Sequence, residues 1–130
     1  MKQRAAAIII VDEKILLMRR IRNGEQYFAV PGGTIEEGET PEVAAVREIL
    51  EETCLDVTLD NLLFEFDGIG GHEYFFAVKN ISGEAKLGGP ELEHNSKDNF
   101  YELAWIPVKE LNETRLLPLE IKNVIMEKTC

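Results

Sequence analysis

Three glutamates, Glu48, Glu51 and Glu52, have the type and spacing of residues that bind a cation. They stand at i, i+3 and i+4, so in a helix with roughly 100° per residue their side chains share one face. Three like charges on one face repel one another, and a bound cation relieves that repulsion. A solvated acidic surface is the plainer alternative, because most charge runs do no more than face water. The pattern favours a cation site and leaves the solvated face open.

A helix must carry these carboxylates, and the sequence predicts one from Thr40 to Cys54. Thr40 is a natural N-cap, Pro41 suits the first helical position, and no further Pro or Gly precedes Cys54. Gly32 and Gly33, ahead of the helix, let the backbone come close to whatever the carboxylates bind. The apolar residues of the opposite face are expected to pack onto a core: Val43, Val46 and Leu50, with Ile49 at the edge.

One arginine lies within this acidic stretch. Arg47 stands four residues before Glu51, where it can hold one carboxylate without neutralising the set, and Glu39 offers it a second partner. We therefore expect Arg47 and Glu39 to hold the loop against the helix, and we place this structural role above a catalytic one.

Taken together, these residues resemble a known family motif. Gly33, Glu39 and residues 47–55 match the Nudix box, G-x5-E-x7-R-E-U-x-E-E-x-G-U, in which U is a bulky aliphatic residue. Every fixed position agrees except Cys54, where the family usually has glycine. Residues 27–31 resemble the strand that enters the box, and residues 105–107 resemble the strand end before the last helices. The resemblance to the Nudix hydrolase family thus covers most of the chain.

The resemblance implies a fold and a metal site. The implied fold is α/β, a Nudix-type α/β/α sandwich with a mixed β-sheet, formed by a single Nudix hydrolase domain over residues 1–130. The implied metal ligands and catalytic carboxylates are Glu48, Glu51 and Glu52, with the Gly32 carbonyl as a candidate ligand. The implied structural residues of the box are Gly33, Glu39 and Arg47. Such hard oxygen ligands suit Mg²⁺, with Mn²⁺ as a substitute, while the absence of a His or Cys cluster disfavours zinc.

The reaction implied by the resemblance is metal-dependent hydrolysis of a phosphoanhydride bond in a nucleoside diphosphate linked to another moiety. Bound metal lowers the pKa of a coordinated water, and a nearby carboxylate takes its proton. Glu52 and Glu48 are both candidates for that base, although family members differ in using a loop residue instead. The candidates for such an additional acid, for each of which a solvated surface position is the simpler expectation, are Glu91, Glu93, Asp98 and Glu102.

Two other functions compete with this one. A catalytically silent nucleotide-binding or regulatory module would keep the same fold, but degenerate members usually lose box carboxylates, and all three are present here. An isoprenoid diphosphate isomerase would need additional acid–base residues that the sequence does not identify. Candidate substrate contacts are Arg19, Arg20 and Tyr27, for which solvent exposure or a place in the core is the simpler expectation.

Composition limits the partners. The chain has 130 residues and a net charge of -10, from 24 acidic and 14 basic residues, so it has little attraction for a nucleic-acid polymer or an anionic membrane. A small nucleotide or nucleotide conjugate is the expected partner. Two cysteines make no disulfide framework, and no apolar stretch approaches a membrane span of roughly 20 residues, so we expect a cytoplasmic protein. Monomer and homodimer both remain open.

The remaining elements follow from hydrophobic pattern and turn residues. Strands are predicted at residues 4–11, 14–20, 27–30 and 73–78, at 101–106 as the last strand, and once or twice within 57–66. Residues 80–99 read as a long loop, 108–111 as a helical turn, and 119–128 as a helix that places Ile121, Val124 and Ile125 on one side. His72 and His94 are expected to have surface or core roles. Short connections between the early strands argue against a doubly wound parallel sheet.

Cys54 departs from the box pattern. Glycine normally ends this helix in a left-handed conformation, which costs any other residue roughly 1 kcal/mol or more. Either Cys54 bears that strain or the helix ends differently. Because the position lies beyond the carboxylates, we expect a change in stability more than a loss of activity.

Overall fold

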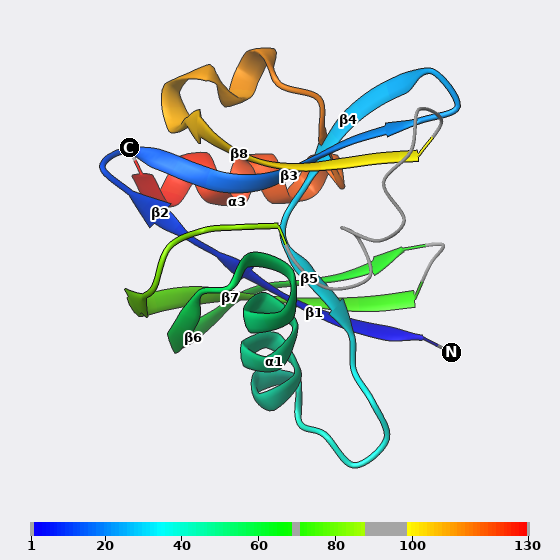
Figure 1. Ribbon diagram of the computed structural model, residues 1–130, viewed down its shortest axis with the longest axis vertical. Helices are drawn as coiled ribbons and strands as arrows, with labels where there is room; N and C mark the ends of the chain where they lie inside the picture. The colour runs from blue at the N-terminus through cyan, green and yellow to red at the C-terminus, as the bar shows by residue number, and fades with distance from the viewer. Residues whose placement is uncertain (1, 69–70, 88–98, 130) are drawn as a thin grey trace.

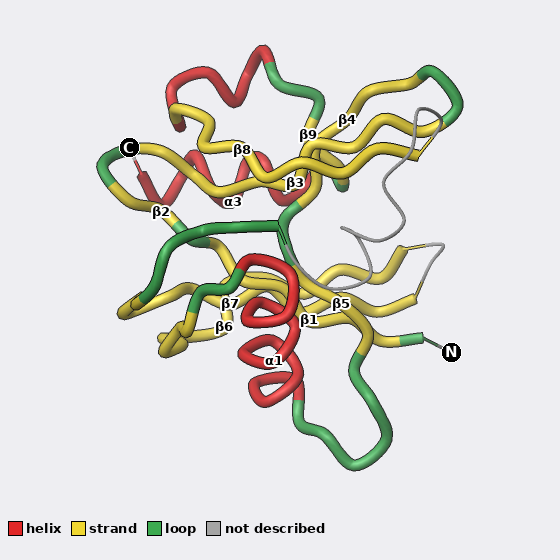
Figure 2. Tube along the Cα trace, viewed as in Figure 1, coloured by secondary structure: helices red, strands yellow, loops and turns green. Residues whose placement is uncertain are grey.

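The structure, a computed structural model, describes residues 2–68, 71–87 and 99–129. These described residues form two sheets and two α-helices (Figures 1 and 2). The helices and strands in chain order are β1 Gln3–Ile8, β2 Ile10–Val11, β3 Lys14–Arg22, β4 Glu25–Ala29, β5 Gly32–Thr34, α1 Pro41–Thr53, β6 Asp56–Gly68, β7 Gly71–Ser82, β8 Asn99–Pro107, the 3-10 helix η1 Val108–Glu113, β9 Leu116–Leu117 and α3 Leu119–Thr129.

The first sheet is mixed, as expected. Its strand order is β5-β1-β7-β6, with β1 parallel to β7 and the other pairs antiparallel. The second sheet has the order β2-β3-β4-β9, and β8 pairs with β3. Among the described strands of this sheet, β4 and β9 pair in parallel and the other pairs are antiparallel. The prediction that the chain is not a doubly wound parallel sheet is confirmed.

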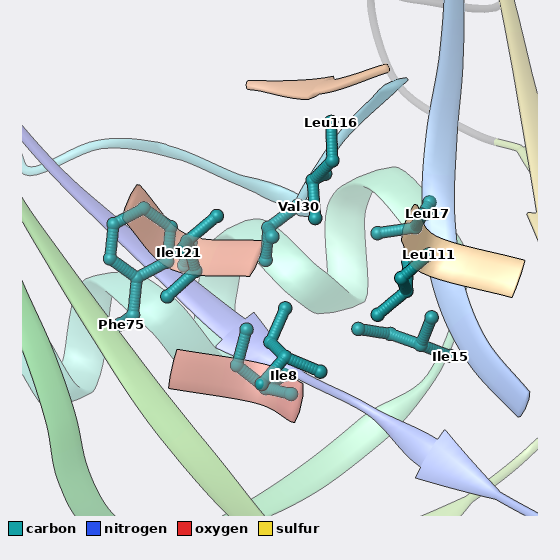
Figure 3. Packing of buried hydrophobic residues seen from close by; sticks show 10 residues of the cluster. Ile8, Ile15, Leu17, Val30, Phe75, Leu111, Leu116 and Ile121 are labelled. Atoms are coloured by element: carbon teal, nitrogen blue, oxygen red, sulfur yellow. The ribbon is translucent and has the colours of Figure 1, made fainter. Parts of the chain in front are cut away.

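Alternation along β1 and β7 places helices on both faces of the first sheet. Ala5 and Phe76 pack with Ala44 and Ala45 of α1. Their neighbours in sequence point the other way, into the main core with α3 and the second sheet. That core, partly drawn in Figure 3, comprises Ala6, Ile8, Ile15, Leu17, Val30, Phe75, Leu111, Leu116, Ile121 and Ile125. The first sheet therefore lies between α1 and α3, which confirms the α/β/α sandwich.

Several predicted strands have different limits in the structure. The apolar run predicted as one strand at residues 4–11 is interrupted at Ile9, because its two parts, β1 and β2, belong to different sheets. The break expected at residues 60–61 is a set of register shifts between Thr58 and Phe64 within one strand, β6. The strand at 101–106 is not the last, since β9 follows it. Part of the predicted loop at 80–99 is strand up to Ser82, while residues 88–98 lie outside the described residues.

The buried face of α1 also differs from the prediction. Val43 and Leu50 are 55% and 50% exposed, whereas Ala44, Ala45 and Ile49 are fully buried. The two small alanines let the helix come close to β1. The buried face of α1 therefore lies nearer to the acidic residues than the predicted face with Val43 and Leu50. The prediction for α3 is confirmed, with Ile121 and Ile125 buried. Among the described residues, no helix is long and apolar enough to span a membrane.

Candidate active site

Helix α1 begins and ends where the sequence predicts. The Oγ1 of Thr40 accepts a hydrogen bond from the N–H of Val43 at 3.2 Å, and Pro41 occupies the first turn. At the other end Cys54 has φ 63° and ψ 13°, and its N–H donates to the Leu50 carbonyl at 3.0 Å. Of the two alternatives for Cys54, the left-handed cap is the one observed. The residue therefore bears the conformation that normally favours glycine.

Arg47 is the centre of a hydrogen-bond network that joins the loop to the helix. Its Nε and Nη2 donate to the two carboxylate oxygens of Glu39 at 2.7 and 2.8 Å, a bidentate arrangement. Nη2 also donates to the Thr34 carbonyl at 3.0 Å. Nη1 donates to Glu48 at 2.9 Å and to Glu51 at 3.3 Å. These contacts support the structural role expected for Arg47 and Glu39.

The same network shifts the ionisation of its members. The bidentate hydrogen bonds from Arg47, followed by one from the N–H of Glu36, lower the pKa of Glu39 from 4.5 to about 2. The Glu39 hydrogen bond is also the main cause of a raised pKa for Arg47. Both groups are therefore charged at neutral pH, and the loop is fixed to the helix by an ion pair.

The two glycines of the loop are closely packed, Gly32 against the backbone of β1 and Gly33 against the side chain of Glu48. A Cβ at Gly33 would lie 2.2 Å from the carboxylate of Glu48. A Cβ at Gly32 would lie 2.4 Å from the carbonyl oxygen of Ala5 and 2.6 Å from the Cα of Ala6, because β5 crosses close to β1. Because Gly33 has no side chain, the Glu48 carboxylate can lie against the loop. Because Gly32 has none, β5 can pair closely with β1.

The three glutamates line one cavity of about 340 Å³, together with Arg4, Gly32, Gly33 and Thr34. Their exposure is graded. Glu52 is buried, at 6% exposed, while the side chains of Glu48 and Glu51 are 17% and 49% exposed. The Oε2 of Glu52 accepts a hydrogen bond from the N–H of Gly32 at 3.1 Å. The loop and the helix therefore form one acidic unit around the cavity.

The donor set suits a hard divalent cation. Carboxylate and carbonyl oxygens are the ligands that Mg²⁺ and Mn²⁺ prefer, and a buried carboxylate such as Glu52 is stabilised by a nearby positive charge. In the described part of the chain, no three Asp, Glu, His or Cys side chains already converge on one metal position. Glu48 is turned toward Arg47, and the half-exposed Glu51 has room to rotate. The residues fit the ion by their chemistry and their shared cavity, and metal binding requires side-chain rotation.

Sequence reasoning missed Arg4. It lines the acidic cavity, and its Nη2 donates to the Gly32 carbonyl at 3.2 Å. The contact joins residues 28 positions apart and depends on the antiparallel pairing of β1 with β5. No local pattern in the sequence signals this pairing.

The predicted substrate contacts lie on the second sheet and do not line the acidic cavity. The Arg20 guanidinium lies 3.8 Å from the ring centroid of Tyr101 and 5.8 Å from that of Tyr27. Arg19, the next residue along the strand, pairs instead with Glu102 at 3.0 Å. Glu102, one of the candidate acids, is therefore an ion-pair partner on β8. The other three candidates, Glu91, Glu93 and Asp98, lie outside the described residues.

His72 has partners that the sequence did not reveal. The β6–β7 hairpin brings Asp67 and Glu65 to its two ring nitrogens. The hydrogen bond that His72 donates to Asp67, and then the one that it donates to Glu65, raises the pKa of His72. This cluster does not line the acidic cavity, in keeping with the surface role expected for His72, while His94 lies outside the described residues.

A second, larger cavity of about 560 Å³ lies between the β2–β3 hairpin and the start of η1. Its walls are mainly apolar, and it contains none of the box residues. The smaller acidic cavity combines convergent carboxylates, close-packed glycines and a fixed arginine network, so we take it as the candidate active site.

Known proteins resemble this chain in both sequence and structure. The NUDIX domain model matches residues 1–126. An ADP-ribose pyrophosphatase from Methanocaldococcus jannaschii is 40% identical over 107 residues, covering 75% of this chain and 63% of that protein. An ADP-ribose pyrophosphatase from Mycobacterium tuberculosis is 28% identical over 127 residues, covering 93% of this chain and 60% of that protein. This chain thus spans less than two thirds of the length of these curated relatives.

Solved structures agree over almost the whole chain. The crystal structure of a MutT NUDIX hydrolase from Burkholderia pseudomallei superposes with a TM-score of 0.72 at 26% identity, covering 99% of this chain and 98% of that one. MutT from Aliivibrio salmonicida and Vibrio cholerae, described in one structural study, gives a TM-score of 0.74 at 24% identity, covering 97% and 98%. The first match, at 26% identity, supports membership of the same family. The second, at 24% identity, supports the shared fold alone.

Proposed function

We propose that this chain, which belongs to the Nudix hydrolase family, hydrolyses a phosphoanhydride bond in a nucleoside diphosphate linked to another moiety. The observation that carries this proposal is the acidic cavity, where Glu48, Glu51 and the buried Glu52 meet the Gly32 loop. A diphosphate is strongly anionic, so it enters such a cavity only together with a cation. The proposed partner is accordingly a small nucleotide conjugate with a divalent metal.

In this proposal Glu48, Glu51 and Glu52 hold the metal, and the Gly32 carbonyl is a further candidate ligand. Mg²⁺ is the proposed ion and Mn²⁺ its substitute, because both favour oxygen ligands. When bound, such an ion neutralises the diphosphate, polarises the attacked phosphorus and lowers the pKa of water. The chain's own contribution is to gather the carboxylates around one cavity. Arg47 holds Glu48 beside that cavity, from where the side chain would rotate to reach the metal, and Gly33 leaves the space into which the Glu48 carboxylate fits.

We propose that the proton of the attacking water goes to a box carboxylate, with Glu52 and Glu48 as the two candidates. Glu48 shares a 2.9 Å ion pair with Arg47, which offsets part of its negative charge. Glu52 is the more buried of the two and accepts a hydrogen bond from the N–H of Gly32. The pH profile of kcat for Glu52→Gln and Glu48→Gln separates the two. The acidic limb, along which the base becomes protonated, should be altered most in the variant that has lost the base.

ADP-ribose is the first substrate to test, because two relatives with substantial coverage of this chain are named ADP-ribose pyrophosphatases. Purified protein with Mg²⁺ should convert ADP-ribose to AMP and ribose 5-phosphate. A panel of nucleoside triphosphates, dinucleotides and sugar nucleotides tests the breadth of this activity. If the protein binds a panel member tightly but hydrolyses none of them, with either Mg²⁺ or Mn²⁺, the enzyme hypothesis fails and the catalytically silent binding module is supported.

Three further expectations remain proposals. Arg19, Arg20 and Tyr27 are proposed substrate contacts, and the stacking of Arg20 on Tyr101 supports a role for this cluster next to an aromatic base.

A cytoplasmic location and the absence of a nucleic-acid partner are supported by the net charge of -10 and the lack of a disulfide framework in the sequence. Monomer and homodimer both remain compatible with these features.

A further inference from the structure

Arg4 is the one basic residue among the described residues that line the acidic cavity. Its Nη1 donates to Oε2 of Glu73 at 3.0 Å, and its Nη2 donates to the Gly32 carbonyl at 3.2 Å. These partners lie on opposite sides of β1, because β1 runs between β5 and β7. The guanidinium is therefore held from both neighbouring strands, although the side chain is 40% exposed.

The hydrogen bonds of Arg4 leave it able to bind an anion. A guanidinium has five N–H donors in a planar fork, and the two contacts to described residues use one donor on each terminal nitrogen. Glu73, whose side chain is 17% exposed, fixes the direction of the fork. A fixed, partly exposed fork is well suited to phosphate oxygens, which it binds with charge-assisted hydrogen bonds.

The charges that line the cavity suggest how Arg4 could contribute to substrate binding. The lining carries three carboxylates and one guanidinium. A diphosphate approaching this wall is repelled by the carboxylates, and the metal that they hold offsets only the part of the substrate that it touches. A second, fixed positive charge on the same wall offsets negative charge on another part of the diphosphate and orients the substrate.

We infer that Arg4 binds a phosphoryl oxygen of the diphosphate in the acidic cavity, with Glu73 and the Gly32 carbonyl fixing its guanidinium. The inference rests on the proposed function, since it takes the diphosphate as the reactive part of the substrate. The competing role is purely structural. In that case Arg4 only holds the Gly32 backbone in place, and its loss would disturb the metal site before it disturbed phosphate binding.

The test compares Arg4→Gln, which removes the charge, with Arg4→Lys, which keeps the charge without the fork. Arg115→Gln is the matched control. Arg115 also lies near a glutamate, with Nη2 3.8 Å from Glu25, and donates to a backbone carbonyl, that of Gln26, at 3.4 Å. It does not line the acidic cavity. The measurements are Mn²⁺ binding by electron paramagnetic resonance, inorganic pyrophosphate binding in the presence of Mn²⁺ by calorimetry, thermal unfolding, and kcat and KM for ADP-ribose.

We expect Arg4→Gln to weaken pyrophosphate binding and to raise the KM for ADP-ribose by about 10- to 100-fold, the range for one charge-assisted hydrogen bond. Arg4→Lys should have a smaller effect, Mn²⁺ binding should be no weaker than in the wild type, and Arg115→Gln should match the wild type. Unchanged pyrophosphate binding in Arg4→Gln would overturn the inference. A parallel loss of Mn²⁺ binding would also overturn it in favour of the structural role.

The two proposals fail in different ways. If the wild type turns over no member of the substrate panel, the proposed activity fails, while the pyrophosphate measurement still tests Arg4. If the wild type hydrolyses ADP-ribose and Arg4→Gln does so with an unchanged KM, the activity stands and the role of Arg4 fails. Should Arg4→Gln unfold, the same comparison is made with Arg4→Lys, which must then raise KM above the wild-type value.

Discussion

Replacing Cys54 by glycine should stabilise the protein, because Cys54 holds a left-handed conformation at the end of α1. Its φ of 63° and ψ of 13° lie in the region where a Cβ is crowded by the neighbouring backbone. Relief of this crowding contributes about 1–2 kcal/mol. Glycine also increases the freedom of the unfolded chain, which costs about 0.4–1 kcal/mol. The side chain of Cys54 is exposed, so little buried surface is lost. The net gain is about 1 kcal/mol.

For a chain of this size, such a gain corresponds to a rise in Tm of about 3–5 °C. Thermal unfolding should be compared with urea unfolding, since the slope of the urea transition shows whether the unfolded state has changed. Cys54→Ala is the matched control, because it removes the thiol but keeps the Cβ and hence the strain. Activity should stay at the wild-type level in both variants, since Cys54 does not line the acidic cavity.

Two results would refute this reasoning. If Cys54→Gly is no more stable than the wild type, the left-handed conformation carries no cost at this position. If Cys54→Ala gains as much as Cys54→Gly, the thiol and not the backbone is the source of the instability. Only a gain confined to glycine supports the strained cap.

Three further predictions concern the box itself. The double change Glu51→Gln and Glu52→Gln should lower metal-dependent turnover by more than about 100-fold while circular dichroism stays unchanged, and a wild-type rate would remove both residues from the site. Gly33→Ala would place its Cβ 2.2 Å from the Glu48 carboxylate and force that side chain to shift, so Mn²⁺ binding should weaken by about tenfold or more; unaltered binding would show that the metal does not need Glu48 in its observed position. Glu39 has a pKa lowered from 4.5 to about 2, so its ion pair stabilises the fold above pH 4.5 and is lost as the pH falls toward 2. In urea unfolding the advantage of the wild type over Glu39→Gln should therefore be present at pH 7 and shrink at pH 3, and a constant difference would contradict the ion pair.

Much of the fold was predictable from local chemistry. Turn residues and alternating apolar runs placed the strands, and Thr40 and Pro41 placed the start of α1, because caps and turns act over a few neighbouring residues. The failures were at longer range. The apolar run through Ile9 gave no sign that the chain passes from one sheet to another, since both parts of the run are suited to strands. Similarly, exposed Val43 and Leu50 were predicted to be buried, because hydrophobicity alone does not say how closely a helix with two alanines approaches a sheet.

For the site, the sequence by itself determined the carboxylates and their common helix face, because side chains at i, i+3 and i+4 meet wherever a helix forms. It also identified Arg47 and Glu39 as partners, since both lie in one short stretch. The tertiary structure alone decided which glutamate is buried, that the Glu48 side chain packs on Gly33, and that Arg4 reaches the Gly32 carbonyl. The reason is physical: these features depend on β1 pairing with β5 and packing under α1, and strand pairing between distant segments is fixed by the whole core.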